Sequence, residues 1–336
     1  MRTIPGFRKG CNLGGWLSQC YLSPEHIADF ITEKDFEKIR NMGMDHVRLP
    51  VDYPLFETKE GEDIEQGYAC IDRCMQWCEK YGLHVLLDLH KVPGYEFSKA
   101  EECHSFFTDL ALRKRFIRIW DKLSRRYGKY DFVAFDLLNE IVDDSVCDDW
   151  NSLARETILQ IRKNAKNNWI LVGGTYYNSI FTVKNIFCPE EIKDDHIAYS
   201  FHFYEPHIFT HQAAEWEKNM TPDFRVPYPL SVEDYLEVSS RELNGAYSDV
   251  LLASDASLSG YDMLAAWFAE AVSVAETRNV PLYCGEYGVI DHANPDYALA
   301  WYRDIHSVFE KYNIGRAMWN YRGMGFGLRE EEVPFL

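Results

Sequence analysis

The 336-residue sequence predicts an α/β protein folded as a (β/α)₈ barrel of the TIM type, in a single domain over residues 1–336. Short apolar segments alternate with longer amphipathic segments along the chain, which is the pattern of parallel strands joined by crossover helices. Eight such apolar segments occur, the number that closes a barrel. Charged and aromatic side chains follow these segments, where an ordinary turn would carry Gly, Asn, Asp, Ser or Pro.

The expected elements follow from this alternation. The eight predicted strands cover residues 10–13, 46–49, 84–88, 133–136, 170–173, 196–200, 282–284 and 317–319. Helical periodicity between them predicts helices over residues 33–42, 67–81, 109–127, 149–168, 260–279 and 294–312. Residues 183–193 have room for a short helix only. No proline-rich or serine-rich linker interrupts the chain, which favours one domain.

One connection is much longer than the few residues that usually join a strand to a helix. Residues 205–259 form an insertion after the sixth strand, with no clear helical pattern before residue 260. The insertion is rich in aromatic residues: Phe209, Trp216, Phe224, Tyr228, Tyr235 and Tyr247. These rings either wall a cleft or form a small core of the insertion itself, and the sequence leaves both interpretations open.

Composition excludes several classes of partner. The formal net charge is −18, so nucleic acid and anionic membrane surfaces would be repelled. No run approaches eighteen apolar residues, and residues 1–9 lack the apolar segment of a signal peptide, so no export signal is visible and localisation stays open.

Nine cysteines, an odd number without paired spacing, indicate a reduced protein. Cys70, Cys74 and Cys78 are expected to be buried as small hydrophobic residues.

The side chains that follow the predicted strands are of types that carry out chemistry. In a barrel of this kind, the reacting groups project from the carboxyl ends of the strands. The residues at these positions are Arg48, His90, Asn139, Glu140, Tyr176, Tyr177, Asn178, His202, Tyr204, Glu286, Trp319 and Asn320. Their joint placement after different strands indicates one site at one end of the barrel.

Two of these residues, Glu140 and Glu286, follow the fourth and seventh strands and can therefore face each other across the mouth of the barrel. Cleavage of a glycosidic bond with retention of configuration needs one neutral carboxyl as acid/base and one ionised carboxylate as nucleophile, about 5–5.5 Å apart. Glu140 is the predicted acid/base and Glu286 the predicted nucleophile. A separation of about 6.5–9.5 Å would instead predict inversion.

The remaining residues suit supporting roles around a sugar. Arg48 can hold Glu286 ionised through a charge-assisted hydrogen bond, and Tyr204 can donate to the same carboxylate. Asn139 suits the 2-hydroxyl of the reacting sugar, while His90 and His202 supply further hydrogen-bond donors. Trp319 offers a flat apolar face on which a pyranose can stack.

Seven ordered motifs resemble glycoside hydrolase family 5, a family of clan A barrels that includes many endo-β-1,4-glucanases. They span nearly the whole chain: residues 10–16 (GCNLGGW), 46–50 (HVRLP), 87–90 (LDLH), 138–140 (LNE), 200–204 (SFHFY), 285–288 (GEYG) and 319–321 (WNY). The stretch 203–212 is similar to the start of the insertion in the compact endoglucanase C type.

The resemblance implies a retaining endo-β-1,4-glucanase that hydrolyses cellulose, mixed-linkage β-glucan or cellodextrins as a monomer, without cofactor or metal. It implies Glu140 as acid/base and Glu286 as nucleophile. The predicted substrate-binding residues are Arg48, His90, Asn139, His202, Tyr204, Trp319, Asn12, Trp16 and Asn178.

Three other functions stay open at this point. The first is another β-glycanase of the same family, a β-mannanase or β-1,3-glucanase. The second is a sugar-binding barrel without catalytic activity. The third is a metal-dependent hydrolase that uses His202, His207 and His211, although no metal-binding motif accompanies these histidines.

The end of the chain departs from the family pattern. The family continues after the eighth strand into a closing helix, but residues 323–327 (GMGFG) give little helical signal. We therefore expect this helix to be short or missing, and the melting temperature to be lower than that of a longer form of the chain.

Overall fold

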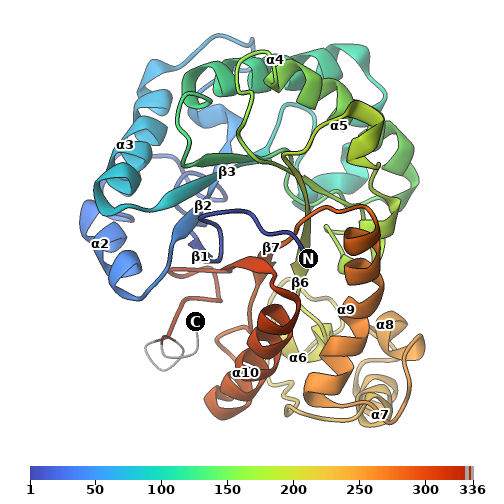
Figure 1. Ribbon diagram of the computed structural model, residues 1–336. Coiled ribbons are helices and arrows are strands. Elements are labelled where there is room, and N and C mark those ends of the chain that lie inside the picture. Colours follow the sequence, from blue (N-terminus) through green and yellow to red (C-terminus); the bar gives the residue numbers. More distant parts are fainter. Residues whose placement is uncertain (330–332, 334–336) are drawn as a thin grey trace.

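The computed structural model describes residues 1–329 and 333, and its sheet is a closed barrel of eight parallel strands. Each strand pairs with the next along the chain, and β1 closes the ring by pairing with β8 (Figure 1). The predicted (β/α)₈ barrel is thereby confirmed. The strands are β1 Lys9–Asn12, β2 His46–Asp52, β3 His84–Lys91, β4 Val133–Asp136, β5 Ile170–Gly173, β6 Ile197–Phe203, β7 Leu282–Tyr287 and β8 Gly315–Met318.

Helices surround the barrel (Figure 1). The α-helices are α1 Pro24–Asp29, α2 Glu33–Asn41, α3 Glu65–Tyr81, α4 Leu110–Tyr127, α5 Cys147–Ile161, α6 His207–Thr210, α7 Val232–Glu242, α8 Asp249–Leu252, α9 Gly260–Thr277 and α10 Pro295–Tyr312. Short 3₁₀ helices are η1 Tyr53–Leu55, η2 Phe97–Glu102, η3 His104–Phe107, η4 Asp144–Val146, η5 Ile180–Asn185 and η6 Pro189–Ile192. None of the helices among the described residues is both long and apolar enough to span a bilayer.

Two predictions about the helices were wrong or incomplete, and a third agrees with the structure. The helix predicted over residues 149–168 ends at Ile161, because the polar stretch that follows folds into turns. The short helix expected over residues 183–193 is two separate 3₁₀ helices, η5 and η6. Residues 319–329, which follow β8, contain no helix, in agreement with the expectation that the closing helix is short or missing; residues 330–332 and 334–336 lie outside the described part of the chain.

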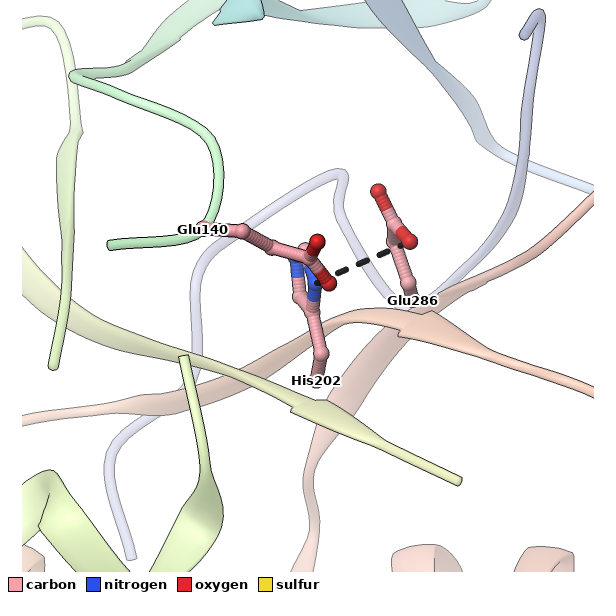
Figure 2. A group of neighbouring side chains, drawn as sticks. All are labelled: Glu140, His202 and Glu286. Carbon is pink, nitrogen blue, oxygen red and sulfur yellow. Dashed lines mark hydrogen bonds and ion pairs between the residues drawn. The ribbon is translucent and has the colours of Figure 1, made fainter. Parts of the chain in front are cut away.

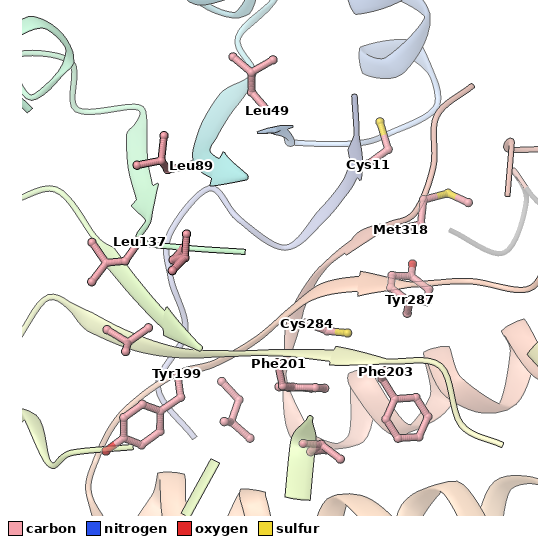
Figure 3. Packing of buried hydrophobic residues seen from close by; sticks show 14 of the residues in the cluster. Cys11, Leu49, Leu89, Leu137, Tyr199, Phe201, Phe203, Cys284, Tyr287 and Met318 are labelled. Atoms are coloured by element: carbon pink, nitrogen blue, oxygen red, sulfur yellow. The ribbon is translucent and has the colours of Figure 1, made fainter. Parts of the chain in front are cut away.

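The side chains of the strands alternate between the interior of the barrel and the surrounding helices. The outward set is apolar and packs under the helices as the main hydrophobic core (Figure 3). Cys11, Phe201 and Cys284 belong to this set. All nine cysteines are free thiols, and Cys70, Cys74 and Cys78 on α3 are buried as predicted.

The interior of the barrel is apolar at its amino-terminal end. There the residues before β1 fold under the strands, and Ile4 and Phe7 close the opening. They pack in a second hydrophobic cluster with residues from six strands: Leu86, Ala134, Leu171, Ala198, Tyr283 and Ala317. We call Ile4, Phe7 and these six residues the apolar plug.

The insertion after β6 contains the helices α6, α7 and α8. The expectation that no clear helix precedes residue 260 was wrong, because α7 has eleven residues and begins with a capping box between Ser231 and Asp234. Most of the aromatic residues form the insertion's own core: Phe209, Phe224, Tyr228 and Tyr235 are buried. Trp216 is exposed and Tyr247 is half-buried, so of the six aromatic residues only these two can still line a cleft.

Candidate active site

Glu140, in the loop after β4, and Glu286, in β7, meet at the carboxyl end of the barrel with the imidazole of His202 beside them (Figure 2). A carboxyl oxygen of each glutamate and a ring nitrogen of His202 all lie within 4.8 Å of one another. The Nδ1 atom of His202 is 2.9 Å from Oε1 of Glu140 and 3.6 Å from Oε2 of Glu286. The two carboxyls are therefore close enough to act on the two sides of one bond.

Arg48 of β2 is the centre of the charged network beneath these carboxyls and is completely buried. Its guanidinium contacts three carboxylates, those of Glu286 at 2.8 Å, Asp136 at 3.0 Å and Asp88 at 3.1 Å. It also donates to Oδ1 of Asn139 at 3.0 Å. Burial disfavours the charge of Arg48, but these carboxylates outweigh burial and raise its pKa, so the side chain stays a cation.

Both carboxyl oxygens of Glu286 accept a hydrogen bond. Nη1 of Arg48 donates to Oε1 at 2.8 Å, and the hydroxyl of Tyr204 donates to Oε2 at 2.9 Å. Burial and the neighbouring carboxylates raise the pKa of Tyr204 well above its ordinary value, so its proton stays in place. Donors on both oxygens fix the orientation of the Glu286 carboxyl, which suits a nucleophile.

The carboxyl of Glu140 lies in a different environment. Burial raises the pKa of its carboxyl to about 7, because no cation pairs with it directly. At neutral or lower pH, about half or more of this carboxyl is therefore protonated. The backbone at Glu140 is in the left-handed region with φ at 37°, and its carbonyl accepts a hydrogen bond from the Tyr95 hydroxyl at 2.8 Å.

The two histidines of the site have opposite pKa shifts. Burial lowers the pKa of His202 to about 4, so its ring is neutral when it contacts Glu140. Burial also acts on His90, but the Asp88 carboxylate, 2.7 Å from Nδ1, outweighs it and raises the pKa of His90. The Nε2 atoms of both rings are buried and have no hydrogen-bond partner among the described residues.

Asn139 and Trp319 surround the space above Arg48. The Oδ1 atom of Asn139 accepts from Arg48, which fixes the amide and leaves Nδ2 without a hydrogen-bond partner in the described residues. The Trp319 ring lies parallel to the His90 ring, with 6.0 Å between centroids and 8° between planes. Its other neighbours, including Phe326 and Ile290, are apolar.

Three predicted substrate-binding residues, Asn12, Trp16 and Asn178, are completely buried. Asn12 has no exposed surface, and its amide donates to backbone carbonyls of β7 and β8, such as that of Gly285 at 2.9 Å. Trp16 is also fully buried; its indole stacks on Trp77 and donates to the Ile27 carbonyl. Asn178 is fully enclosed and packs against Gly173. The motifs fix the position of these residues on the chain but not the direction of the side chain, and their contact with substrate stays a prediction.

Two functional residues, Asp88 and Asp136, were missed by the sequence analysis. Each is a fully buried carboxylate that contacts Arg48, and Asp88 also fixes the ring of His90. A signal was present, since each Asp lies at or near the end of an apolar strand at an inward position. A charged residue there needs a buried partner, which the nearby Arg48 supplies.

The three histidines in and after β6, namely His202, His207 and His211, do not gather into a metal site. His207 bonds to Glu217 through Nε2 at 2.9 Å, and His211 bonds to Thr210 through Nδ1 at 3.0 Å. Within residues 1–329 and 333, the one cluster of three candidate ligands is Glu140, His202 and Glu286. The guanidinium of Arg48 already contacts Glu286 there, and its positive charge would repel a cation.

The order of the motifs and the full extent of the match decide the family. The family described as cellulase (glycosyl hydrolase family 5) matches residues 12–325. The chain belongs to glycosyl hydrolase family 5. It is therefore a glycoside hydrolase, and the resemblance seen in the sequence is confirmed.

Curated relatives support the same assignment over almost the full length. Endoglucanase C of Acetivibrio thermocellus is 41% identical over 332 residues, which cover 97% of this chain and 94% of the relative. Cellodextrinase A of Ruminococcus flavefaciens is 38% identical over 312 residues, covering 93% and 84%. The similarity therefore extends over the barrel and the insertion together.

Solved structures share the fold. The crystal structure of cellulose synthase subunit Z from Clostridioides difficile is 25% identical, with a TM-score of 0.74 over 97% of this chain and 95% of that one. Endoglucanase Cel5A of Thermotoga maritima has a TM-score of 0.73 at 21% identity, over 97% and 93%.

Proposed function

We propose that this family 5 hydrolase is a retaining endo-β-1,4-glucanase, with Glu286 as nucleophile and Glu140 as acid/base. The observation that carries the proposal is the approach of the two carboxyls to within 4.8 Å. This approach agrees with the separation of about 5–5.5 Å in retaining enzymes, whereas inverting enzymes need about 6.5–9.5 Å for a water molecule.

The first step forms a covalent bond between the substrate and Glu286. A carboxylate oxygen of Glu286 attacks the anomeric carbon while the protonated Glu140 transfers its proton to the leaving oxygen. The pKa of about 7 supports this role, because Glu140 then carries its proton at the start of the reaction. Arg48 and Tyr204 hold the attacking carboxylate in place through the two oxygens.

The second step reverses the proton transfer. Glu140, now ionised, takes a proton from water as that water attacks the anomeric carbon and releases Glu286. The neutral ring of His202, 2.9 Å from Glu140, can orient the carboxyl in both steps without adding a full charge beside it.

Three groups are suited to hold the reacting sugar. The Nδ2 atom of Asn139 supplies a donor for the 2-hydroxyl, a contact that strengthens in the oxocarbenium-like transition state. The Nε2 atom of His90 supplies another polar contact, and the Trp319 ring supplies an apolar face. These groups suit a β-linked glucan such as cellulose, mixed-linkage β-glucan or a cellodextrin, as the names of the curated relatives also suggest.

The test is product analysis on cellulose, mixed-linkage β-glucan, β-1,3-glucan and mannan, with the configuration of the first product followed by NMR. We expect fastest cleavage of β-1,4-glucans, internal cuts, and first products in the β configuration. First products in the α configuration would contradict retention. Faster cleavage of mannan or β-1,3-glucan would replace the substrate assignment, and no turnover on any substrate would favour the sugar-binding barrel.

A further inference from the structure

The insertion after β6 brings a buried histidine, His211, against the tyrosine that contacts Glu286. Tyr204 directly follows β6 and donates its hydroxyl to Oε2 of Glu286 at 2.9 Å. The ring of His211, which follows α6, lies edge to face against the Tyr204 ring, with 5.0 Å between centroids and 75° between planes. The insertion therefore reaches Glu286 through one intermediate, the side chain of Tyr204.

A second link joins His211 to the backbone of Tyr204. The hydroxyl of Thr210, which has no exposed surface, donates to the Tyr204 carbonyl, a group that can only accept. A hydroxyl has one proton, so the contact between this oxygen and Nδ1 of His211, at 3.0 Å, is a hydrogen bond donated by the ring. Tyr204 is thus held at its ring, at its carbonyl and at its hydroxyl.

The ring of His211 is neutral in this environment. Burial, followed by the charge of His207, lowers the pKa of His211 well below its ordinary value. A neutral ring with its proton on Nδ1 has one donor, and that donor points at Thr210. The contact with Tyr204 therefore orients the tyrosine without placing a second full charge near Glu286.

Other residues of the insertion hold the His211 ring in place. The His207 ring stacks on it, with 4.1 Å between centroids and 11° between planes. Nε2 of His207 lies 2.9 Å from Oε1 of Glu217, and the Tyr247 ring stacks on His207 with 5.3 Å between centroids. An apolar ring would fill the position of His211 without the desolvation that a buried imidazole suffers, so this histidine indicates a role beyond packing.

We propose that His211 is a positioning residue for the nucleophile, on which it acts through Tyr204. The imidazole and the Thr210 hydroxyl fix the direction of the Tyr204 side chain, so that its hydroxyl stays aligned with Glu286. The inference rests on the proposed function and gives the insertion a part in the chemistry. Such alignment matters because a misplacement of about 1 Å can lower the rate of a reaction by about 100-fold.

The test is a double-mutant cycle in the full-length enzyme, followed by kcat/KM on cellotetraose. Tyr204→Phe should lower kcat/KM about tenfold or more, because Glu286 loses one of its two donors. We expect His211→Ala to lower it about five- to tenfold in the wild type and less than about twofold in the Tyr204→Phe background, where the hydroxyl through which His211 acts is absent. Equal losses in the two backgrounds would overturn the proposal.

An activated substrate separates alignment of the nucleophile from contacts with the leaving sugar. The leaving group of 2,4-dinitrophenyl β-cellobioside is not a sugar, but Glu286 still has to attack the anomeric carbon. His211→Ala should slow the burst of dinitrophenolate by the same factor, within about twofold, as it lowers kcat/KM on cellotetraose. A loss confined to cellotetraose would make His211 a residue for the leaving sugar and would overturn its action on the nucleophile.

A second pair of variants keeps the proposal testable if His211→Ala does not fold. Thr210→Val preserves the shape of the buried side chain but removes the hydroxyl, and it should lower kcat/KM about threefold or more in the wild type and less than about twofold in Tyr204→Phe. Thr210→Ser keeps the hydroxyl and should stay within about twofold of the wild type. The same loss in Thr210→Val and Thr210→Ser would assign the effect to packing and refute the link.

The matched control removes a histidine from the other end of the barrel. His196 directly precedes β6 and packs edge to face on Trp169, so His196→Ala should leave kcat/KM unchanged. A loss equal to that of His211→Ala would show a general effect on the fold and would refute the proposal. Absence of turnover in the wild type would refute the proposed function and this inference together, whereas an active wild type with an additive cycle would refute the inference alone.

Discussion

The interior of the barrel has two contrasting ends formed by the same strands. At the amino-terminal end, the apolar plug fills the interior, and the buried His46 beside it has a hydrogen-bond partner on each ring nitrogen. At the carboxyl end, Arg48, Asp88, Asp136 and Glu286 are buried together, with polar atoms that have no partner among the described residues. The first end stabilises the fold, whereas the second keeps desolvated groups ready for chemistry. Changes at the two ends should therefore have separable effects on activity and stability.

The largest effect on activity is expected from Glu286→Gln. This change removes the nucleophile and should lower kcat on cellotetraose by roughly 10⁴-fold or more, while the melting temperature and oligosaccharide binding stay close to wild type. Steady-state kinetics and calorimetry provide the two readouts, with the exposed Glu276→Gln as control. Wild-type activity in Glu286→Gln would disprove the assignment.

Glu140→Ala should give a loss that depends on the leaving group. Without a proton donor, cleavage of cellotetraose should fall about 10²–10⁴-fold. Formation of the covalent intermediate from 2,4-dinitrophenyl β-cellobioside needs no such donor and should be nearly unaffected. The burst of dinitrophenolate measures this first step. An equal loss of the first step on both substrates would mean that Glu140 has another role.

A change in the apolar plug should affect stability first. Phe7→Ala leaves a cavity in the plug and should lower the free energy of unfolding by about 3–5 kcal/mol. The kcat of the folded fraction should stay near the wild-type value. Denaturant unfolding measures the loss, and Leu252→Ala, at a position 69% exposed, should change stability by less than about 0.5 kcal/mol. A matching fall in kcat would show that the two ends are coupled.

Glu140→Gln tests whether ionisation of Glu140 at the catalytic end lowers the free energy of unfolding as the pH rises. The folded-state pKa of Glu140 is raised to about 7, so the folded state holds this proton more tightly than the unfolded state does. The resulting stabilisation is complete below the ordinary pKa of 4.5 and is lost as the pH rises through about 7.

Glutamine stays neutral at every pH. The stability of the variant relative to wild type should therefore increase between pH 5 and pH 8, by on the order of 1–3 kcal/mol. Urea unfolding at the two pH values measures the difference. For the same reason, wild-type activity should fall as the pH rises above about 7, and parallel pH dependence of stability in both proteins would contradict the raised pKa.

The smallest effect is expected from a metal chelator. Because Arg48 contacts Glu286 and donates a hydrogen bond to it, EDTA should leave kcat on cellotetraose unchanged. Loss of activity in EDTA, restored by a divalent cation, would revive the metal-dependent alternative.

The sequence predicted the barrel and the residues at the strand ends, because strand alternation and helical periodicity are local patterns. It located Glu140, Glu286, Arg48 and Tyr204, whose contacts with one another are now described. The direction of a side chain at a strand end depends on packing, and for this reason the sequence did not show that Trp16 stacks on Trp77 in the core.

Other features were missed for identifiable reasons. Helix α7 has a capping box at Ser231, but the surrounding aromatic residues masked the helical pattern. Asp88 and Asp136 look like ordinary strand residues until Arg48 is placed between them. The left-handed turn at Tyr176 contains no glycine, and two of the bonds that hold it involve Ile141 and His202, which are distant in the sequence.

The pairing of β1 with β8 has a consequence for synthesis of the protein. β1 contains residues 9–12, and its partner contains residues 315–318, so the ribosome makes β1 long before β8. Until β8 emerges, one edge of β1 and one edge of the newest strand have no partner and can pair with other chains. The nascent chain therefore stays exposed to aggregation until β8 pairs with β1 and closes the barrel.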